Sequence, residues 1–498
     1  MQSMNILSKY WIITLVLLHV LAVWVSVGHY HDDEYFQILD FAALKLGFVM
    51  QDTVMWEYQS GIRSGFQPFI AYTIVKMLSF FNITSPFVWA FYLRLLTATL
   101  SLFSVIMFCQ VAKREINSTN ILHWTAFFIL FSWIQIFLNV RFSAEGWSTS
   151  LFILAYSIYF CSKSLNIKKY FYVGLLLGFS FLARYQIGFL FFGLGFWVLF
   201  FGKETKRDLL IICLGFFIAL FIGVIIDYWL YGRLTFSAWE YFEWHIIKGS
   251  LDNLTFYHQP WWFYIHYSAL QLVPPITLFL PFIVVAFWIL FYRHPITWLT
   301  VPFVLFHHYF PHKEMRFLFP ALPFVPIMFS MVLETSIKKF NLNSMVFFKL
   351  SLKFIIFLSL LINSILVILV LSLPASKEVA LWQDCFNKYL SSESSVILVL
   401  DPDSSGSTVG ELELDFYNIR DVPIISVSNE SQISGKLLEF PDKKFLYTSR
   451  KKDRTKELFD NNVSNRMVCQ ALPQWILKIN INNWTSRASI WQIWEIKK

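Results

Sequence analysis

The sequence predicts a polytopic α-helical membrane protein that ends in a small α/β domain outside the membrane. Hydrophobic residues make up 57% of the 498 positions, the mean hydropathy is +0.55, and only 14% of residues are charged. Such a composition is typical of proteins that cross a bilayer several times. Apolar runs of spanning length recur between residues 10 and 373, whereas the runs after residue 374 have the length of strands.

The first apolar run, residues 10–28, is interpreted as a retained membrane helix. It has the roughly 20 residues that a spanning helix needs. It is longer than the hydrophobic core of a usual signal peptide, and no convincing small-residue cleavage site accompanies it. The polar and aromatic residues 38–66 then suit interfacial amphipathic helices, and residues 68–81 are expected at the same surface because they are too short to span.

Further membrane spans follow. Together with the first helix, the length criterion predicts about eleven spans. We expect them at residues 86–111, 121–140, 147–161, 170–183, 187–201, 209–230, 264–291, 296–310, 317–332 and 347–373.

The charges of the connecting loops orient these spans. If the N-terminus is inside and the spans alternate, the basic residues fall in the inside loops, as the positive-inside rule requires. These residues are Lys113, Arg114, Lys163, Lys168, Lys169, those between Lys203 and Arg207, Arg293, Lys338 and Lys339.

The unusual clusters of ionisable residues all fall in the outside loops. Loops that were merely solvated would scatter such clusters over both faces, so their convergence predicts a functional site on the outer face. The clusters lie at residues 29–37, 141–145, 184–186, 227–264 and 312–316.

Three consecutive carboxylates, Asp32, Asp33 and Glu34, follow the first span directly. Two interpretations fit them. They form a solvated cap at the end of a membrane helix, or they are functional, as ionisable residues at membranes often are. Two interpretations also fit the outer loop at residues 227–264. Its aromatic residues suit headgroup anchors somewhat better than sugar stacking, and His258 suits either a substrate contact or an interfacial histidine.

Residues 374–498 are expected to form a soluble outer domain. Residues 1–373 are expected to form a membrane domain with outer loops at 29–66 and 227–264. Residues 396–400, 422–427 and 444–447 are expected to form short strands. No glycine-rich phosphate loop is present, so no nucleotide site is expected. Cys385 and Cys469 can pair if this domain faces an oxidising compartment, but their spacing alone does not establish the bond.

Several classes of function are disfavoured. The net charge of +8 comes from scattered loop residues and no nucleic-acid motif is present, so nucleic acid is not expected as a partner. The five cysteines are too dispersed for a zinc motif. A transporter should carry charged residues in the middle of its spans, often with repeat symmetry, whereas most charges here lie at span ends.

The outer face suits glycosyl transfer from a lipid-linked donor, since neither ATP nor nucleotide sugars are available there. A carboxylate must take the proton from the acceptor hydroxyl, and cations must stabilise the charge that grows on the departing phosphate. Asp33 and Glu34 offer the first, and Arg184, His312, Lys313 and Arg316 offer the second. A lone carboxylate base opposite the leaving group gives inversion, and the basic residues make a metal ion unnecessary.

Five stretches, taken in order, resemble the dolichyl-phosphate-mannose-dependent mannosyltransferases of glycosyltransferase family 22, over roughly residues 9 to 340. The last of them, HKEMRFL with Pro320 and Pro323, is the most specific. Departures include Asp32 where proline is usual, and Tyr185-Gln186 after Arg184 where Pro-Thr is frequent. The stretches are HDDEYFQ at 31–37, MWEY at 55–58 with Arg63, Ser64 and Pro68, DYWLYG at 227–232, YHQPWWFY at 257–264, and HKEMRFL at 312–318.

The resemblance implies the GT-C membrane fold, a dolichyl- or polyprenyl-phosphate mannose donor and a lipid-linked glycan acceptor, such as a GPI precursor or an oligosaccharide. By position, Asp33 is the expected base and Glu34 the close alternative, because neighbouring carboxylates couple. No cofactor or metal is expected. His312, Lys313 and Arg316 would hold the donor phosphate, with Arg184 and Arg63 as further candidates; Glu57, Arg63, Arg141, Glu145, His258 and Trp261 would shape the acceptor site or brace its loops.

Two questions of identity stay open at this point. The protein resides in the endoplasmic reticulum membrane if it is eukaryotic, or in the cytoplasmic membrane if it is bacterial, with its site on the luminal or periplasmic side. The alternative enzyme is a bacterial GT-C transferase that uses another polyprenyl-phosphate sugar for an envelope glycan. A lipid or sugar transporter is the remaining alternative.

Overall fold

The computed structural model describes residues 8–161, 166–248, 258–341, 346–385, 396–400, 414–418, 422–426, 439, 443–450 and 464–497. The chain forms two compact units, each built from separate stretches of sequence. The first, here the helical unit, comprises Met1–Val23, Met55–Ala71 and Leu93–Leu371. The second, here the sheet unit, comprises Trp24–Val54, Tyr72–Tyr92 and Ser372–Lys498.

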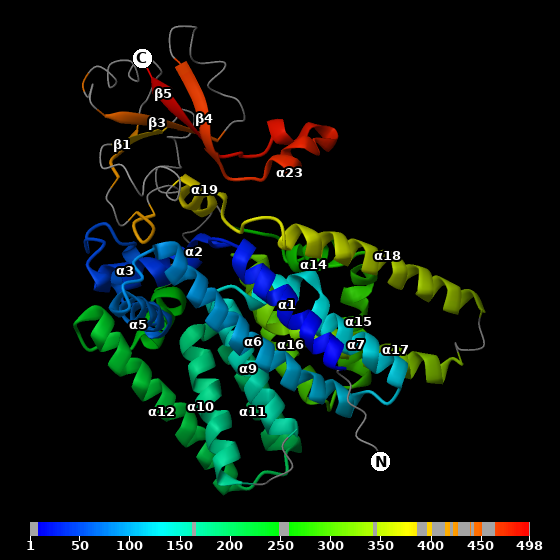
Figure 1. The fold of residues 1–498 in the computed structure, drawn as a ribbon. Coiled ribbons are helices and arrows are strands. Elements are labelled where there is room, and N and C mark those ends of the chain that lie inside the picture. The colour runs from blue at the N-terminus through cyan, green and yellow to red at the C-terminus, as the bar shows by residue number, and fades with distance from the viewer. Residues whose placement is uncertain are drawn as a thin grey trace. The chain divides into compact units, whose positions relative to one another are not determined.

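Helices account for nearly all regular structure before residue 372, and each expected span coincides with one or more of them (Figure 1). In chain order they are α1 Lys9–Val25, α2 Asp32–Glu34, η1 Tyr35–Leu39, α3 Asp40–Leu46, α4 Trp56–Ser60, α5 Phe66–Phe80, α6 Pro86–Glu115, α7 Thr119–Phe131, α8 Trp133–Asn139, α9 Ala144–Cys161, α10 Ile167–Ala183, η2 Tyr185–Ile187, α11 Gly188–Phe201, α12 Lys206–Tyr231, α13 Ser237–Phe242, η3 Glu243–Ile247, α14 Phe263–Gln271, η5 Ile276–Phe279, α15 Leu280–Leu290, α16 Pro295–Tyr309, η6 Met315–Phe324, α17 Val325–Lys339 and α18 Val346–Val370.

Close helix pairs in the helical unit depend on small residues. A Cβ added to Gly174 of α10 would lie 2.0 Å from the carbonyl oxygen of Ile212 on α12. A Cβ added to Gly193 of α11 would lie 2.1 Å from the carbonyl oxygen of Trp298 on α16. Small residues that let backbones approach are the usual basis of helix packing in membranes.

The core of the helical unit contains a cluster of packed aromatic rings. The ring of Phe324 meets those of Phe108 and Tyr156 edge-on, each at 5.3 Å between centroids. These rings come from η6, α6 and α9, so the core joins the segment that carries the HKEMRFL motif to two long helices.

The expected count of about eleven spans is not confirmed. Within the described residues, four helical stretches are long and apolar enough to cross a membrane, or five if the bent pair α7 and α8 forms one span. The expected span at 121–140 bends by 43° at Ser132, and that at 264–291 divides around Pro274 and Pro275 into α14, η5 and α15. The four stretches are Pro86–Glu115, Lys206–Tyr231, Met315–Lys339 and Val346–Val370.

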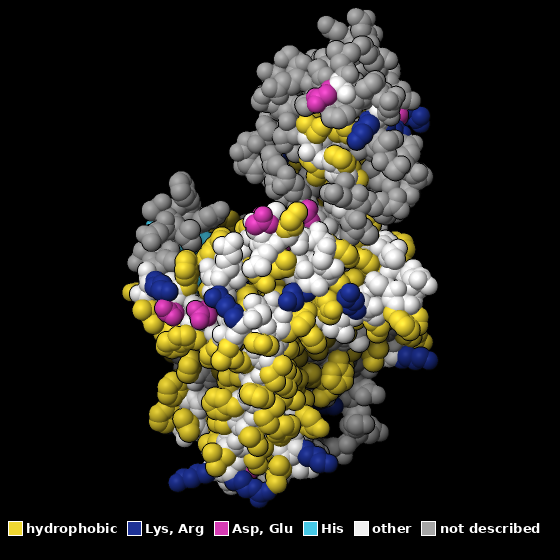
Figure 2. All heavy atoms as spheres, turned by 90° about the vertical axis from the view of Figure 1, so that its left-hand side faces the viewer, with side chains coloured by type: hydrophobic (Ala, Val, Ile, Leu, Met, Phe, Trp, Pro, Cys, Tyr) yellow, Lys and Arg dark blue, Asp and Glu magenta, His cyan; other side chains and the backbone are white. Residues whose placement is uncertain are grey.

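The outer face of α12 is apolar, as expected for a helix in contact with lipid. Figure 2 shows a broad band of hydrophobic side chains on the side where α12 lies, with Lys and Arg below it. Along α12, Leu210, Phe217 and Phe221 are each more than 60% exposed. Together with the four candidate spans, this surface identifies an integral membrane protein.

Among the residues that the structure describes, the sheet unit holds five strands in the order β2-β1-β3-β5-β4. β1 pairs in parallel with β2 and β3, and β5 pairs antiparallel with β3 and β4. The strands expected at 396–400, 422–427 and 444–447 are therefore present as β1, β2 and β3. Bounds are β1 Val396–Leu400, β2 Ile424–Ser426, β3 Lys444–Ser449, β4 Ser464–Gln470 and β5 Gln492–Lys497, with α19 Lys377–Cys385, α23 Gln474–Lys478 and η10 Ile481–Ser486.

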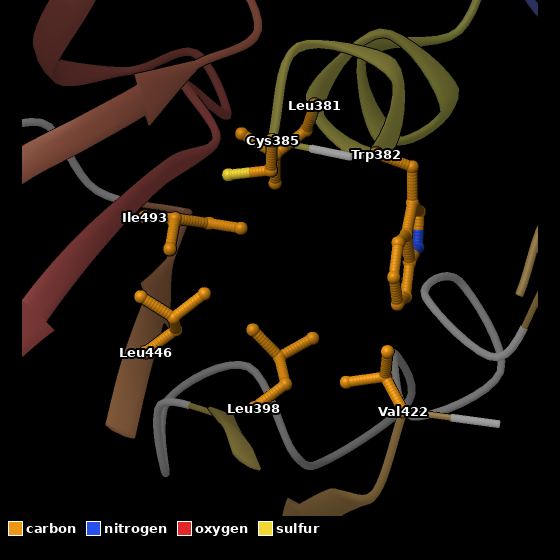
Figure 3. A pocket seen from close by; sticks show the side chains of 7 residues that line it. All are labelled: Leu381, Trp382, Cys385, Leu398, Val422, Leu446 and Ile493. Atoms are coloured by element: carbon orange, nitrogen blue, oxygen red, sulfur yellow. The ribbon is translucent and has the colours of Figure 1, made fainter. Parts of the chain in front are cut away.

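Helix α19 covers this sheet and is bonded to it. Figure 3 shows Leu381, Trp382 and Cys385 of α19 facing Leu398, Leu446 and Ile493, which come from three different strands. Cys385 forms a disulfide with Cys469 of β4, so the pairing left open by the sequence exists.

Candidate active-site elements

The acidic segment, residues 29–37, belongs to the sheet unit and begins with one short helical turn, α2. The ring nitrogen Nδ1 of His31 accepts from the backbone N–H of Asp33 at 3.2 Å, so His31 caps this turn. Glu34 accepts from the backbone N–H of Tyr30 at 3.2 Å. The carboxylate of Glu34 is thus held by a local contact, and Oδ1 of Asp33 lies 3.6 Å from Nδ1 of His31, whereas the side chain of Asp32 is 75% exposed.

A π-helix, η1, follows the two carboxylates directly. Such wide turns are rare and often occur at functional sites, because they shift the register of the side chains around them. Asp32 therefore fits the cap interpretation, while Asp33 and Glu34, half-buried at the start of an irregular helix, fit the functional one.

The acidic segment is fixed at both ends by residues from the last part of the chain. Before it, the carbonyl oxygen of Val27 accepts from the N–H groups of Ala375 and Ser376 at 2.9 and 3.0 Å. After it, the hydroxyl oxygen of Tyr35 accepts from the N–H of Phe416 at 2.9 Å. Tyr35 is fully buried and its ring stacks on that of Tyr417, with centroids 6.1 Å apart.

A buried carboxyl, Asp40, lies one helical turn beyond the segment. Burial, and then the neighbouring carboxylate of Asp415, raise the pKa of Asp40 to about 7. The group is 5% exposed. Its protonation is therefore linked to the packing between α3 and the segment Leu414–Asn418.

The cation cluster lies in the helical unit and is centred on Glu145 of α9. Oxygen Oε1 of Glu145 accepts from the Arg184 guanidinium and, at 3.1 Å, from Arg316. Arg316 also bonds Glu314 at 2.5 Å, and Glu314 accepts from His312 at 2.9 Å. Glu145, Arg184 and Arg316 are each less than 9% exposed, so these charges are shielded from water.

The chain geometry explains how this cluster forms. Glu314 has extended backbone angles, and side chains two residues apart on extended chain point to the same side. His312, Glu314 and Arg316 therefore reach one another directly.

Lys313 points the other way and links the two outer loops. Its ammonium donates to the carbonyl oxygens of Gln259 and Phe310, the former at 3.3 Å, and it is 5% exposed. Next to it, His258 forms an isolated antiparallel bridge with His312. The motifs YHQPWWFY and HKEMRFL thus meet, as expected from their position in the outer loops, although Trp261 is 68% exposed.

A second ion pair joins Glu57 of α4 to Arg63 at 3.0 Å. The Arg63 guanidinium lies 5.6 Å from the centre of the Tyr241 ring, on which His245 stacks at 4.2 Å. Burial, and then the positive charge of Arg63, lower the pKa of His245 to about 4. His245 is therefore neutral at physiological pH and able to accept a hydrogen bond.

Two residues that depart from the usual family pattern make specific contacts. The hydroxyl of Tyr185 lies 2.7 Å from the Ser237 hydroxyl, and Gln186 donates to Tyr241. Both contacts connect η2 to the outer segment α13. The unusual pair thus braces the loop that carries Tyr241 and His245.

The structure brings some of the expected residues together. Arg184, Glu145, Arg316 and His312 form one network, whereas Arg141 is buried beside Phe137, with its guanidinium carbon 4.4 Å from that ring. Three residues with a role in the site were not anticipated.

These three residues are Glu314, Asp227 and Tyr241. Asp227 accepts from the N–H of Gly65 at 2.8 Å and from Ser237, which ties α12 to the start of α5 and to α13. Glu314 could have been found from the sequence, because it stands between His312 and Arg316 in one motif. Asp227 begins the DYWLYG motif, but its contact with Gly65 and that of Tyr241 with Gln186 join distant parts of the chain and have no local signal.

Comparison with known families gives an extensive match. Residues 10–380 match the sequence profile of the Alg9-like mannosyltransferase family. This range contains every expected site residue, from Asp33 to Arg316.

Similar proteins include the GPI alpha-1,2-mannosyltransferase 3 of Bos taurus and of Homo sapiens. The chain is 26% and 27% identical to them over 328 residues, which is 63% of this chain and 57% and 56% of theirs. The GPI mannosyltransferase 3 of Candida albicans is 25% identical over 333 residues, 65% of this chain and 64% of that protein. The chain thus spans less than two thirds of the length of these relatives.

Among solved structures, ArnT from Cupriavidus metallidurans has a similar fold. The apo form superposes with a TM-score of 0.54 at 11% identity, covering 98% of this chain and 97% of that one. The form bound to undecaprenyl phosphate gives a TM-score of 0.53 at 9% identity, covering 98% of both chains. ArnT is a GT-C enzyme, so the likeness confirms the expected fold class and carries no further conclusion.

Proposed function

The chain belongs to the Alg9-like mannosyltransferase family, and we propose that it transfers mannose from dolichyl-phosphate mannose to a lipid-linked glycan with inversion. The acceptor proposed is a GPI precursor, because the similar proteins are named GPI mannosyltransferases. The observation that carries the proposal is the buried cation cluster around Glu145.

The charge of this cluster suits one phosphate. Arg184, Lys313 and Arg316 supply three positive charges against the two carboxylates of Glu145 and Glu314, which leaves an excess of one. A sugar phosphodiester carries one negative charge, and the leaving phosphate monoester gains a second. Arginine forks recognise phosphate oxygens in pairs, and fixed cations in a buried site stabilise charge as it develops.

In the proposed reaction, the acceptor hydroxyl oxygen attacks C1 of the mannose while Asp33 removes its proton. The bond from C1 to the phosphate oxygen breaks, and dolichyl phosphate leaves with the bonding electrons. Attack opposite the leaving group inverts the anomeric centre. The cations of this chain carry the leaving-group charge, so we propose that no metal ion takes part.

The disulfide supports a luminal site. Bonds of this kind persist in oxidising compartments such as the lumen of the endoplasmic reticulum, and Cys385 and Cys469 lie in the same compact unit as the acidic segment. Positive charge at the opposite ends of the helices supports the same orientation. We therefore propose the endoplasmic reticulum membrane, with the carboxylates on the luminal side.

The test supplies radiolabelled dolichyl-phosphate mannose to membranes that contain the wild-type chain or the Arg316→Lys variant. Transfer into a lipid-linked GPI precursor is expected for the wild type. Arg316→Lys keeps the charge but cannot bond both Glu145 and Glu314, so the KM for donor should rise about tenfold or more. If folded wild type consumes no mannose donor but does consume another polyprenyl-phosphate sugar, the assigned substrate is wrong.

A further inference from the structure

A groove in the helical unit, lined in part by Leu322 and Pro323 just beyond the HKEMRFL stretch, has the features of a lipid site. It lies between α18 on one side and α7 and α17 on the other, and its volume is about 450 Å³. Pockets that bind small molecules commonly have volumes of this order. Its walls are apolar, with Trp124, Phe128, Leu333, Leu352 and Ile356 among them.

The groove exists because α18 is attached by one part of its length only. Ser359 and Asn363 are the buried residues of this helix. The Ser359 hydroxyl accepts from the N–H of Ile276 at 3.2 Å. Asn363 accepts from the N–H of Trp133 at 2.8 Å and donates to the carbonyl oxygen of Phe131 at 3.0 Å.

The opposite wall is closed by direct contact between α7 and α17. The hydroxyls of Thr125 and Ser330 lie 2.7 Å apart across these helices. The groove is therefore closed on the side of α7 and α17. Along the first part of α18 it is open at the side, because Val346, Phe347 and Leu350 of that helix are each at least 60% exposed.

The charged residues that line the groove are all basic, and they lie on the first part of α18, where the groove is open at the side. Lys349 and Lys353, four residues apart on one face of α18, line it, and no Asp or Glu does. Glu334, the carboxylate at the same end of α17, is occupied by Lys338 at 3.1 Å and by the N–H groups of Asn117 and Ser118. Neither Lys349 nor Lys353 pairs with an acid within the part of the chain that the structure describes.

The dimensions match one leaflet of a bilayer. A helix rises about 1.5 Å per residue, so the axis from Lys349 to the buried Ser359 covers about 15 Å. Half of a hydrocarbon core of about 30 Å is the same length. A cationic mouth at the membrane surface and an apolar interior one leaflet deep suit an amphiphile with a negative headgroup.

We propose that this groove binds an anionic phospholipid, with an acyl chain between α18 and α17 and the phosphate at Lys349 and Lys353. Basic pockets between membrane helices are known to hold such headgroups on the cytoplasmic side. The positive-inside distribution assigns the end with Lys338, Lys339, Lys349 and Lys353 to that side. The site is separate from the catalytic proposal and does not depend on it.

Native mass spectrometry of the full-length protein, titrated with phosphatidylserine or neutral phosphatidylcholine, tests the assignment. The double variant Lys349→Glu, Lys353→Glu should bind phosphatidylserine about 25-fold more weakly, since each basic residue contributes about 1 kcal/mol of attraction. Lys203→Glu, Lys206→Glu is the matched control, because these exposed lysines lie outside the groove, and it should retain affinity.

A second pair of variants tests the apolar part. Leu333→Trp, Ile356→Trp fills the groove from both walls and should abolish binding, while Phe354→Trp on the outer face of α18 should not. Bound phosphatidylserine should also raise the melting temperature of the wild type but not of the lysine variant. Equal binding by the lysine variant, competition by soluble glycerophosphoserine, or displacement by dolichyl phosphate would each overturn the proposal.

Discussion

Arg184 and Arg316 donate to the same oxygen, Oε1 of Glu145, although one precedes η2 and the other opens η6. One buried carboxylate thus fixes two guanidinium groups before any substrate binds. Preorganised cations of this kind lower the barrier of a reaction in which negative charge grows on a leaving group, because the protein does not reorganise during the step.

Glu145→Gln should therefore impair both stability and donor binding. The substitution leaves two buried guanidinium groups without their shared carboxylate, which typically costs about 3 to 5 kcal/mol. Thermal unfolding in detergent measures the loss. Glu243→Gln breaks the exposed pair with Lys248 and should cost less than about 1 kcal/mol. Equal stability of the two variants would show that the cluster is not electrostatically coupled.

Asp33→Asn should lower kcat by about 100- to 10,000-fold without loss of folded protein, which is the usual contribution of a general base. Steady-state transfer from radiolabelled donor measures it. Asp32→Asn is the matched control, because the side chain of Asp32 is 75% exposed and should not contribute. If Glu34→Gln, and not Asp33→Asn, abolishes transfer, the base is the neighbouring carboxylate.

Asp40 should make stability depend on pH. Its pKa is raised to about 7 in the folded chain, so between about pH 4 and pH 7 the folded state binds more protons than the unfolded state. The stability is greatest below this window and falls as the pH rises through it, by at most about 4 kcal/mol. Asp40→Asn should remove this part of the dependence. The measurement is the melting temperature of the wild type and of Asp40→Asn at pH 5 and pH 8. Equal changes of melting temperature with pH in the two proteins would contradict the prediction.

Tyr35→Phe should weaken the attachment of the acidic segment. The change removes the hydroxyl that accepts from the N–H of Phe416 and leaves a buried donor unsatisfied, at a cost of about 1 to 3 kcal/mol. We expect a lower melting temperature and a lower kcat with the KM for donor unchanged. Tyr30→Phe, in an exposed side chain of the same segment, should behave as wild type. A rise in KM instead would place Tyr35 in the donor site.

Removal of divalent metal should leave transfer unchanged, if three basic residues supply the positive charge for the leaving phosphate as proposed. Activity in the presence and absence of EDTA measures this directly. A loss that Mn²⁺ or Mg²⁺ restores would show that the cations of the chain are insufficient.

Much of the fold could be predicted because it depends on local patterns. Long apolar runs located the helices, and short apolar runs separated by turn residues located β1, β2 and β3. The broken helices were not foreseen, because residues 121–140 and 264–291 read as continuous apolar runs. The Pro274-Pro275 pair is a helix-breaking signal that the apolar reading passed over, whereas nothing in the local sequence marks the bend at Ser132.

The site could be predicted where one motif carried it. His312, Lys313 and Arg316 stand together in the sequence, and Asp33 and Glu34 are adjacent. The roles of Asp227 and Tyr241 depend on partners more than 50 residues away, at Gly65 and Gln186. The attachment of Tyr35 to Phe416 spans 381 positions, and no pattern within either segment indicates it.

The contact between Tyr35 and Phe416 has a consequence for the synthesis of the protein. A ribosome adds about 5 to 20 residues per second, so the 381 positions between Tyr35 and Phe416 take roughly 20 to 80 seconds to make. During that interval the acidic segment has already left the ribosome, while Phe416 and Tyr417, which contact Tyr35, do not yet exist. A nascent chain can insert its helices early but acquires its catalytic conformation late. Premature stop codons between residues 371 and 415 should therefore yield inserted, inactive protein.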